Sequence, residues 1–190
     1  MQVDKELWIR ISQDDQEAYA SVYRFYFRRF YNYGRKFTDD EPLLEDAVKE
    51  VLLTIWDKRS ALSSIEFAGT YFYTTFRYIL FHKLKQKKQG LSSELSIAEP
   101  EFSIDHFIMA RETGQEMKEK LERSLATLTA RQREAIFLRF YEGLSYEEVA
   151  SVLQITTKAT YKIMARALAE LREHLALVVF FGILYRNLDW

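Results

Sequence analysis

Cysteine is absent from this 190-residue chain, and proline and glycine are scarce, with two and six residues respectively. The lack of cysteine excludes disulfides and thiolate metal sites, and it is compatible with a reducing compartment. The scarcity of proline and glycine favours long uninterrupted helices, because these residues most often end a helix. We therefore predict an all-α protein with a cytoplasmic location.

Targeting and enzyme motifs are also missing. Residues 1–10 have no apolar core of the kind that a secretory signal requires. His82, His106 and His174 are widely separated and show no metal-ligand spacing, and neither a phosphate loop nor a nucleophile motif is present. We expect no catalytic residues, no metal ligands, no cofactor and no small-molecule substrate.

The net charge of −1 hides a strong segregation of charge along the chain. Basic segments lie at 24–36 and 77–88, and acidic segments lie at 39–50 and 94–105. Such segregation is typical of a protein with two kinds of partner surface. Because DNA affinity depends on a surplus of cations, we expect the chain alone to bind duplex DNA weakly.

Residues 128–174 carry the pattern of a helix-turn-helix. Ser145 followed by Glu148 forms a capping box, which predicts a helix start at Ser145. Residues 154–156 have the length of the tight turn between two such helices, and Thr156 is placed to cap the second. That second helix has an apolar face at spacings of three and four, made of Thr160, Met164, Ala167, Leu168 and Leu171.

The opposite face of the second helix is polar and basic. A helix with such a face fits the major groove of DNA, where each base pair presents its own pattern of donors and acceptors. An ordinary helical hairpin with a solvated outer face is the alternative. The upstream segment 131–142 favours the DNA-binding interpretation, since it predicts a third helix, ended by Gly143, that completes a small core. The predicted DNA contacts are Thr157, Lys158, Tyr161, Lys162 and Arg166.

The run LTARQREAIFLRFYEGLSYEEVASVLQIT resembles region 4 of bacterial RNA polymerase sigma factors. The resemblance implies that this segment binds the −35 promoter element. Gln154 stands where the family usually has glycine, and Tyr161 and Ile163 stand where it often has Lys or Arg.

The N-terminal part predicts three further helices. Residues 6–37 form an aromatic-rich helical pattern that breaks near residues 12–15, with Ser12 as an N-cap. Pro42 predicts the start of a helix that ends near Arg59. Its segment LLEDAVKEVLLTIW resembles sigma region 2.2, which docks on core RNA polymerase. The resemblance implies a docking surface of Glu45, Asp46, Lys49, Glu50 and Trp56; solvated acids on an ordinary helix are the alternative.

Residues 67–88 interleave aromatic and basic side chains, a pattern that suits single-stranded DNA because bases stack on rings while cations hold the backbone. The segment resembles sigma regions 2.3 and 2.4, which recognise and melt the −10 element, and the family commonly has Asn where Tyr78 stands. Rings buried in a helical core are the alternative interpretation. The predicted −10 contacts are Phe67, Tyr71, Arg77, Lys83 and Lys85.

The domain organisation follows from these segments. We predict a region 2-like domain at 1–88, a flexible linker at 89–115, a region 4-like helix-turn-helix domain at 116–175 and an apolar tail at 176–190. The tail is too short to span a bilayer, and a buried contact is its expected role. This two-domain form resembles sigma factors of the extracytoplasmic function group.

The predicted function is to direct core RNA polymerase to promoters and to assist melting, without catalysis by the chain itself. The expected partners are core RNA polymerase and promoter DNA, with an anti-sigma factor as a further candidate. One rival is a free-standing helix-turn-helix regulator that binds an operator without polymerase. The other rival is a helical adaptor that binds only protein.

Overall fold

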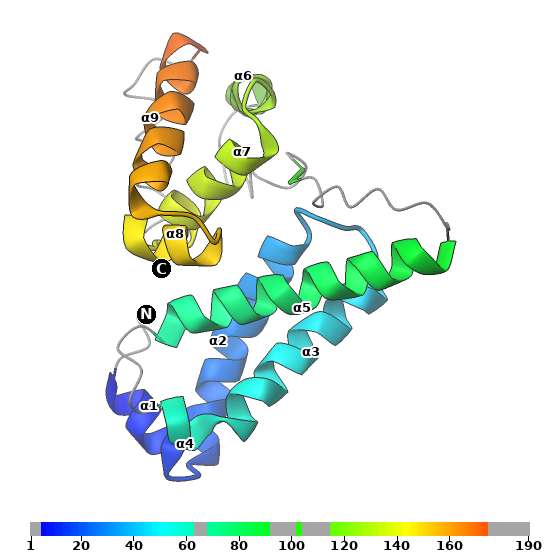
Figure 1. Ribbon diagram of the computed structural model, residues 1–190, viewed down its shortest axis with the longest axis vertical. Helices are drawn as coiled ribbons and strands as arrows, with labels where there is room; N and C mark the ends of the chain where they lie inside the picture. Colours follow the sequence, from blue (N-terminus) through cyan, green and yellow to red (C-terminus); the bar gives the residue numbers. More distant parts are fainter. Residues whose placement is uncertain (1–4, 63–67, 92–101, 104–114, 175–190) are drawn as a thin grey trace. The chain divides into compact units, whose positions relative to one another are not determined.

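The computed structural model of the protein describes residues 5–62, 68–91, 102–103 and 115–174. All regular elements within these ranges are helices, so the fold is all-α as predicted (Figure 1). The chain divides into two compact units, unit 1 at Met1–Pro100 and unit 2 at Glu101–Trp190.

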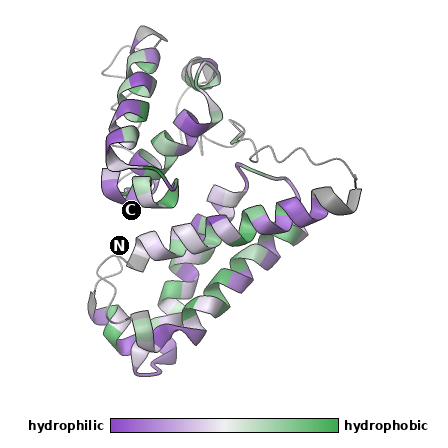
Figure 2. Cartoon of the chain, in the orientation of Figure 1, coloured by the Kyte–Doolittle hydropathy of each residue, from purple (hydrophilic) through white to green (hydrophobic). Residues whose placement is uncertain are grey.

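Unit 1 is built around the packing of α3 against α2 and α5 (Figure 1). The short α1 and α4 lie together at one end of this group. Hydrophilic and apolar residues alternate along α3, as expected of a helix with one buried face (Figure 2). The helices of unit 1 are α1 (Lys5–Ser12), α2 (Gln16–Gly34), α3 (Glu41–Asp57), α4 (Arg59–Leu62) and α5 (Ala68–Leu91).

Aromatic rings form much of the core between α2 and α5. Phe30 stacks on Phe76 with ring centroids 4.9 Å apart, and Tyr73 meets Phe30 edge-on at 5.3 Å. Gly34 ends α2 where the helices approach closely, because a Cβ at this position would collide with the side chains of Leu44 and Phe76. These rings therefore belong to the core. They agree with the alternative interpretation of the aromatic pattern, in which the rings are buried in a helical core and do not bind DNA.

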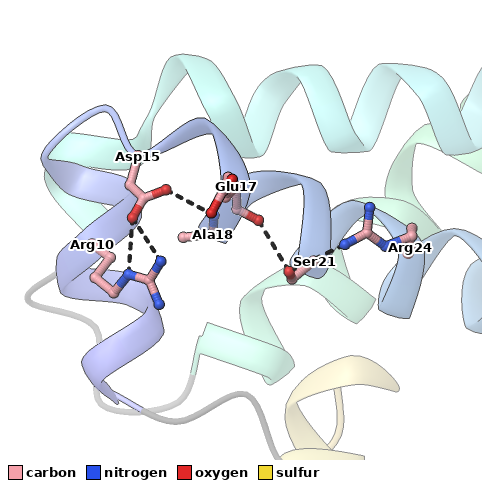
Figure 3. A network of polar contacts seen from close by, with 6 residues as sticks. All are labelled: Arg10, Asp15, Glu17, Ala18, Ser21 and Arg24. Carbon is pink, nitrogen blue, oxygen red and sulfur yellow. Dashed lines mark hydrogen bonds and ion pairs between the residues drawn. The ribbon is translucent and has the colours of Figure 1, made fainter.

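The junction between α1 and α2 corrects one prediction. Asp15, not Ser12, is the N-cap of α2, and its carboxylate accepts a hydrogen bond from the Ala18 amide at 2.9 Å (Figure 3). That bond, with a second one from Arg10, lowers the pKa of Asp15. Ser12 instead closes α1, where its hydroxyl donates to the Ile9 carbonyl at 2.7 Å. Both residue types favour caps, and the left-handed Asp14 (φ 66°) decides where the chain turns.

Unit 2 is a compact group in which α9 packs on α6, α7 and α8. Its core joins Ile136 and Leu138 to Val149, Met164 and Leu171, all almost fully buried. The elements are α6 (Gln115–Ala126), α7 (Ala130–Ile136), the π-helical segment η1 (Phe137–Tyr141), α8 (Tyr146–Val152) and α9 (Thr157–His174).

The helix expected at 131–142 divides into α7 and η1. The amide of Glu142 donates to the Phe137 carbonyl, five residues earlier, at 3.1 Å. Such a widened turn places side chains differently from a continuous α-helix. Gly143 follows with φ 76°, the left-handed conformation that a helix-ending glycine adopts most easily.

Capping boxes fix the starts of α7 and α8. Thr129 and Gln132 form one, and Ser145 and Glu148 form the predicted one. In the second, the Ser145 hydroxyl accepts from the Glu148 amide at 3.1 Å, and the Glu148 carboxylate accepts from the Ser145 amide at 2.8 Å. The sequence signal at Ser145 is confirmed.

Replacing Ser145 with Ala is expected to destabilise unit 2 by about 1 kcal/mol, because an amide of α8 loses its partner. Urea unfolding followed by circular dichroism measures the change. Ser145→Thr, which keeps the hydroxyl, should lose clearly less; an equal loss in both variants would contradict the capping role.

None of the helices in the described part of the chain has both the length and the apolar character needed to cross a bilayer. The same residues include no group of three or more His, Cys, Asp or Glu side chains suited to a metal ion.

Candidate nucleic-acid interface

The turn between α8 and α9 has the predicted position. Gln154 adopts φ 53°, a left-handed conformation that glycine reaches at lower cost than other residues. This conformation gives a physical reason for the glycine that sigma factors usually have at this position. Thr156 then caps α9, accepting a hydrogen bond from the Ala159 amide at 3.2 Å. The two helices are thereby held by a short, ordered turn.

The two faces of α9 divide as the sequence predicted. Thr160, Met164, Ala167 and Leu171 are buried, and Leu168 is half-buried. The outer face is exposed at Lys158, Tyr161, Lys162, Ala165 and Arg166, with Thr157 half-buried at its N-terminal end. Four of the five predicted −35 residues therefore share one solvent-facing surface on a single helix.

Tyr161 is held in place by a layer of stacked side chains. Its ring stacks on Tyr146 of α8 with centroids 4.4 Å apart and planes 13° from parallel. The guanidinium of Arg139, a residue of η1, lies 5.2 Å from the centroid of the Tyr146 ring, and it also donates to the Leu144 carbonyl at 2.8 Å. Tyr161 remains 52% exposed, so it presents a fixed aromatic edge beside the basic residues of α9.

Comparison with known proteins agrees with this geometry. Residues 118–171 match the family model of sigma-70 region 4. Over 175 residues the chain is 26% identical to the RNA polymerase sigma factor NccH of Alcaligenes xylosoxydans xylosoxydans, covering 89% of this chain and 92% of that relative. Residues 118–171 therefore form a sigma-70 region 4 domain, and over most of its length the chain is a homologue of an RNA polymerase sigma factor, which supports a role in transcription initiation.

A solved structure has a similar fold over most of the chain. It is the structure of CnrH in complex with the cytosolic domain of CnrY, with a TM-score of 0.57 and 19% identity over 90% of this chain and 96% of that chain.

The predicted −10 residues lie at different positions around α5. Tyr71 is half-buried and Lys85 is exposed, and both belong to one stripe of the helix. Arg77 is buried, with its guanidinium 4.1 Å from the centroid of the Phe81 ring. Lys83 is half-buried on another side. Phe67 lies outside the described residues.

The exposed stripe of α5 carries a ring pair that the sequence-based list omitted. Tyr78 is 68% exposed, and its ring stacks on that of His82 with centroids 6.2 Å apart and planes 13° from parallel. Tyr71, Tyr78 and Lys85 are seven residues apart, so they recur on the same side of the helix. The i, i+4 spacing of Tyr78 and His82 was the sequence signal that points to this pair.

The predicted docking residues lie on the outer face of α3. Glu45, Asp46, Lys49 and Glu50 are exposed, and Leu53 among them is 61% exposed. Lys49 pairs with Glu45 on the same helix at 3.0 Å, and this hydrogen bond raises the pKa of Lys49. The outer face of α3, defined by these five residues, therefore combines charge with an apolar side chain.

Trp56 lies at the end of this face and is half-buried. Its ring contacts Tyr19 at a centroid distance of 4.7 Å, and the Arg59 guanidinium lies 4.4 Å from the Trp56 ring centroid. The side chain thus has a packing role in unit 1 in addition to any role in docking.

Two ion pairs join α3 and its N-cap to the basic side of α5. Glu50 pairs with Lys83 at 2.9 Å, and Asp40, the N-cap of α3, pairs with Lys87. The bond from Lys87 and a second one from the Leu43 amide lower the pKa of Asp40. Glu50, which is predicted to dock on polymerase, and Lys83, which is predicted to bind DNA, therefore form an ion pair with each other in the free chain.

Proposed function

We propose that this sigma factor binds core RNA polymerase through the outer face of α3 and reads promoter DNA with α9 and α5. The observation that carries the proposal is the outer face of α9, where Lys158, Tyr161, Lys162 and Arg166 are exposed beside each other on the second helix of a helix-turn-helix. An element of this width enters the major groove, and basic side chains on it meet phosphates and base edges.

The proposed −35 reader is α9. Its buried face fixes the helix on α7 and α8, so the exposed side chains keep a constant orientation. Lys158, Lys162 and Arg166 supply the cations, whereas Tyr161 is held by its stack on Tyr146. We expect the cations to provide affinity and Tyr161 to contribute to base preference.

The proposed −10 reader is the exposed stripe of α5, made of Tyr71, Tyr78, His82 and Lys85. Exposed rings provide stacking surfaces for unpaired bases, and lysines beside them attract the backbone. Arg77 has a different role in this proposal, because its guanidinium is packed on Phe81 and orders the helix from within. Lys83 becomes available to DNA only when its pair with Glu50 opens.

The partner proposed for α3 is core RNA polymerase. The relative NccH is named as an RNA polymerase sigma factor, which supports a partner of that kind. An anti-sigma protein is a second proposed partner, because CnrH was solved in complex with the cytosolic domain of CnrY. The exposed Leu53 amid charged residues is the type of apolar anchor that protein interfaces use.

Run-off transcription on a pool of genomic fragments tests the proposal. The sigma factor with core polymerase should produce discrete transcripts that neither component makes alone. A free-standing regulator would bind fragments without polymerase and would not direct initiation. An adaptor that binds only protein would do neither, so the assay separates all three functions.

The free sigma factor is expected to bind promoter DNA much more weakly than the holoenzyme, given its net charge of −1. The ion pairs of Lys83 and Lys87 reduce the cations available to DNA further. A salt-controlled titration of labelled promoter with and without core polymerase measures the difference. Equal affinities would contradict the proposal and favour the free-standing regulator.

Replacing Glu50 with Gln should raise the affinity of the free protein for single-stranded DNA by about two- to fivefold, because Lys83 loses its carboxylate partner. Glu45→Gln is the matched control. It removes the same charge from α3, but Glu45 pairs with Lys49 and not with α5. Near physiological ionic strength charges beyond about 8 Å are screened, so an equal gain in both variants would contradict local masking.

A further inference from the structure

A residue of the predicted linker is part of the core of unit 2. Phe102 is only 1% exposed, and its ring lies 5.7 Å from that of Phe137 in η1. Burial of a phenylalanine side chain is among the larger single contributions to packing. The chain at this point is therefore attached to the region 4 domain, thirteen residues before α6 begins at Gln115.

Arg133 locks the backbone of Phe102 in this position. The Arg133 side chain is buried, and its Nε donates to the Phe102 carbonyl at 2.9 Å while an Nη donates to the Leu128 carbonyl at 2.5 Å. Burying a guanidinium costs free energy unless its N–H groups have hydrogen-bond acceptors. The carbonyls of Phe102 and Leu128 supply such acceptors, so the hydrogen bonds of Arg133 favour this position of the Phe102 backbone. We call Phe102, Leu128, Arg133 and Phe137 the Phe102 clasp.

The clasp changes how much chain joins the two units. From Leu91, the end of α5, to Phe102 there are eleven Cα steps, which span at most about 40 Å. From Leu91 to Gln115 there would be twenty-four steps, which span at most about 86 Å. Attachment at Phe102 thus halves the tether between the −10 and −35 readers.

We propose that Phe102 is a positioning residue that sets the promoter spacing at which this sigma factor works. The proposal rests on the proposed function, because it assumes that the readers of both units engage one promoter. A bivalent binder loses affinity when its tether does not match the distance between its sites. Since one base pair adds about 3.4 Å, a tether limited to residues 92–101 accepts a narrower range of spacer lengths than a tether that extends to Gln115.

The first test uses the free full-length protein and is independent of promoters. The chain has no cysteine, so Lys58→Cys and Arg172→Cys, exposed residues of units 1 and 2, allow specific dye labelling. A flexible insert of about twelve Gly and Ser residues is placed after residue 97, before the clasp, or after residue 109, behind it. The first insert adds about 43 Å to the greatest possible span between Leu91 and Phe102, whereas the second leaves that greatest span unchanged.

In the Phe102→Ala variant the insert after residue 109 should lengthen the dye separation as well, because the clasp is open. Equal lengthening by both inserts in the otherwise unaltered chain would overturn the proposal. Since inserts do not touch the core of unit 2, this comparison holds even if Phe102→Ala unfolds that unit, which its circular dichroism would reveal.

The second test measures transcription by the holoenzyme. A promoter recovered from the genomic pool is rebuilt with spacers shortened or lengthened one base pair at a time. For each variant, transcription from promoters with altered spacers is divided by transcription from the promoter with the best spacer. The insert after residue 97 should raise this ratio at least about threefold, and the insert after residue 109 should leave it unchanged. Identical spacer profiles for the two inserts would refute the role of the clasp, whereas absence of any promoter-dependent transcript would refute the proposed function instead.

Discussion

Reversing Glu45 and Asp46 to Lys is expected to abolish binding to core RNA polymerase and to leave the helical fold unchanged. Both carboxylates are exposed on the outer face of α3. The reversal changes the charge of this face by four units, so any basic partner surface now meets like charges, which costs several kcal/mol and reduces affinity by more than about 100-fold. Co-purification with core polymerase measures the effect.

Stability should change little, because Glu45 and Asp46 make only solvent-exposed interactions. The pair of Glu45 with Lys49 is a solvent-exposed contact within one helix, and such contacts contribute little to stability. Reversal of Glu6 and Glu17 is the matched control, since both are exposed acids of unit 1 outside α3 and the change in net charge is the same. Polymerase that co-purifies with the α3 variant, or that is lost equally from the control, would reject this docking surface.

Glu50 is deliberately left intact in this design. Its carboxylate pairs with Lys83 of α5, so its reversal would disturb the DNA-binding side as well as the docking side. The choice of Glu45 and Asp46 therefore tests docking alone.

Local signals predicted the helix-turn-helix closely. The Ser145 capping box, the turn at Gln154 and the buried stripe from Thr160 to Leu171 all depend on neighbouring residues or on helical periodicity. The same holds for α3, where Asp40 caps the helix and Pro42 follows in its first turn. In both cases the interactions lie within a few residues, so the sequence contains the information directly.

Contacts between residues far apart in the sequence could not be predicted from local sequence signals. Glu50 and Lys83 belong to different helices, and nothing local indicates that they pair. Composition around Phe102 predicted a flexible linker, whereas its backbone carbonyl accepts a hydrogen bond from Arg133, thirty-one residues later. The charge of Arg77 suggested DNA binding, but the burial of its side chain depends on how α5 lies in unit 1.

The division of the −10 residues around α5 has a related cause. Interleaved basic and aromatic residues identify a segment, but only the orientation of the helix decides which of them reach solvent. Because α3 covers one side of α5, Phe76 and Leu80 are buried while Tyr78 and His82 are exposed. The exposed pair is therefore a consequence of packing.

Alanine at Lys158, Lys162 and Arg166 together is expected to remove specific −35 binding by the holoenzyme. These cations share the outer face of α9. Each cation–phosphate contact that is lost reduces the steepness of log affinity against log salt by about 0.9. Loss of three contacts should weaken promoter binding by at least about 100-fold at physiological salt. A salt series on a labelled promoter measures both quantities.

Arg172→Ala is the matched control for loss of a cation. Arg172 is exposed on the same helix, ten residues beyond Lys162, which is about 15 Å along the axis. Its removal should leave affinity and slope nearly unchanged, because a helix that enters the groove through its N-terminal half keeps Arg172 distant from DNA. An equal slope change in Arg172→Ala would place DNA along the whole helix and contradict this geometry.

Replacing Tyr161 tests base preference independently of the cations that provide affinity on the same surface of α9. Tyr161→Ala leaves every cation of α9 in place, so we expect the salt slope to stay the same while discrimination at one base pair falls by about 1–3 kcal/mol. Tyr146→Ala should produce a smaller change of the same kind, because Tyr146 only holds the Tyr161 ring. Binding to a library of −35 variants measures this preference. An unchanged preference in Tyr161→Ala would restrict the role of the stacked layer to packing between α8 and α9.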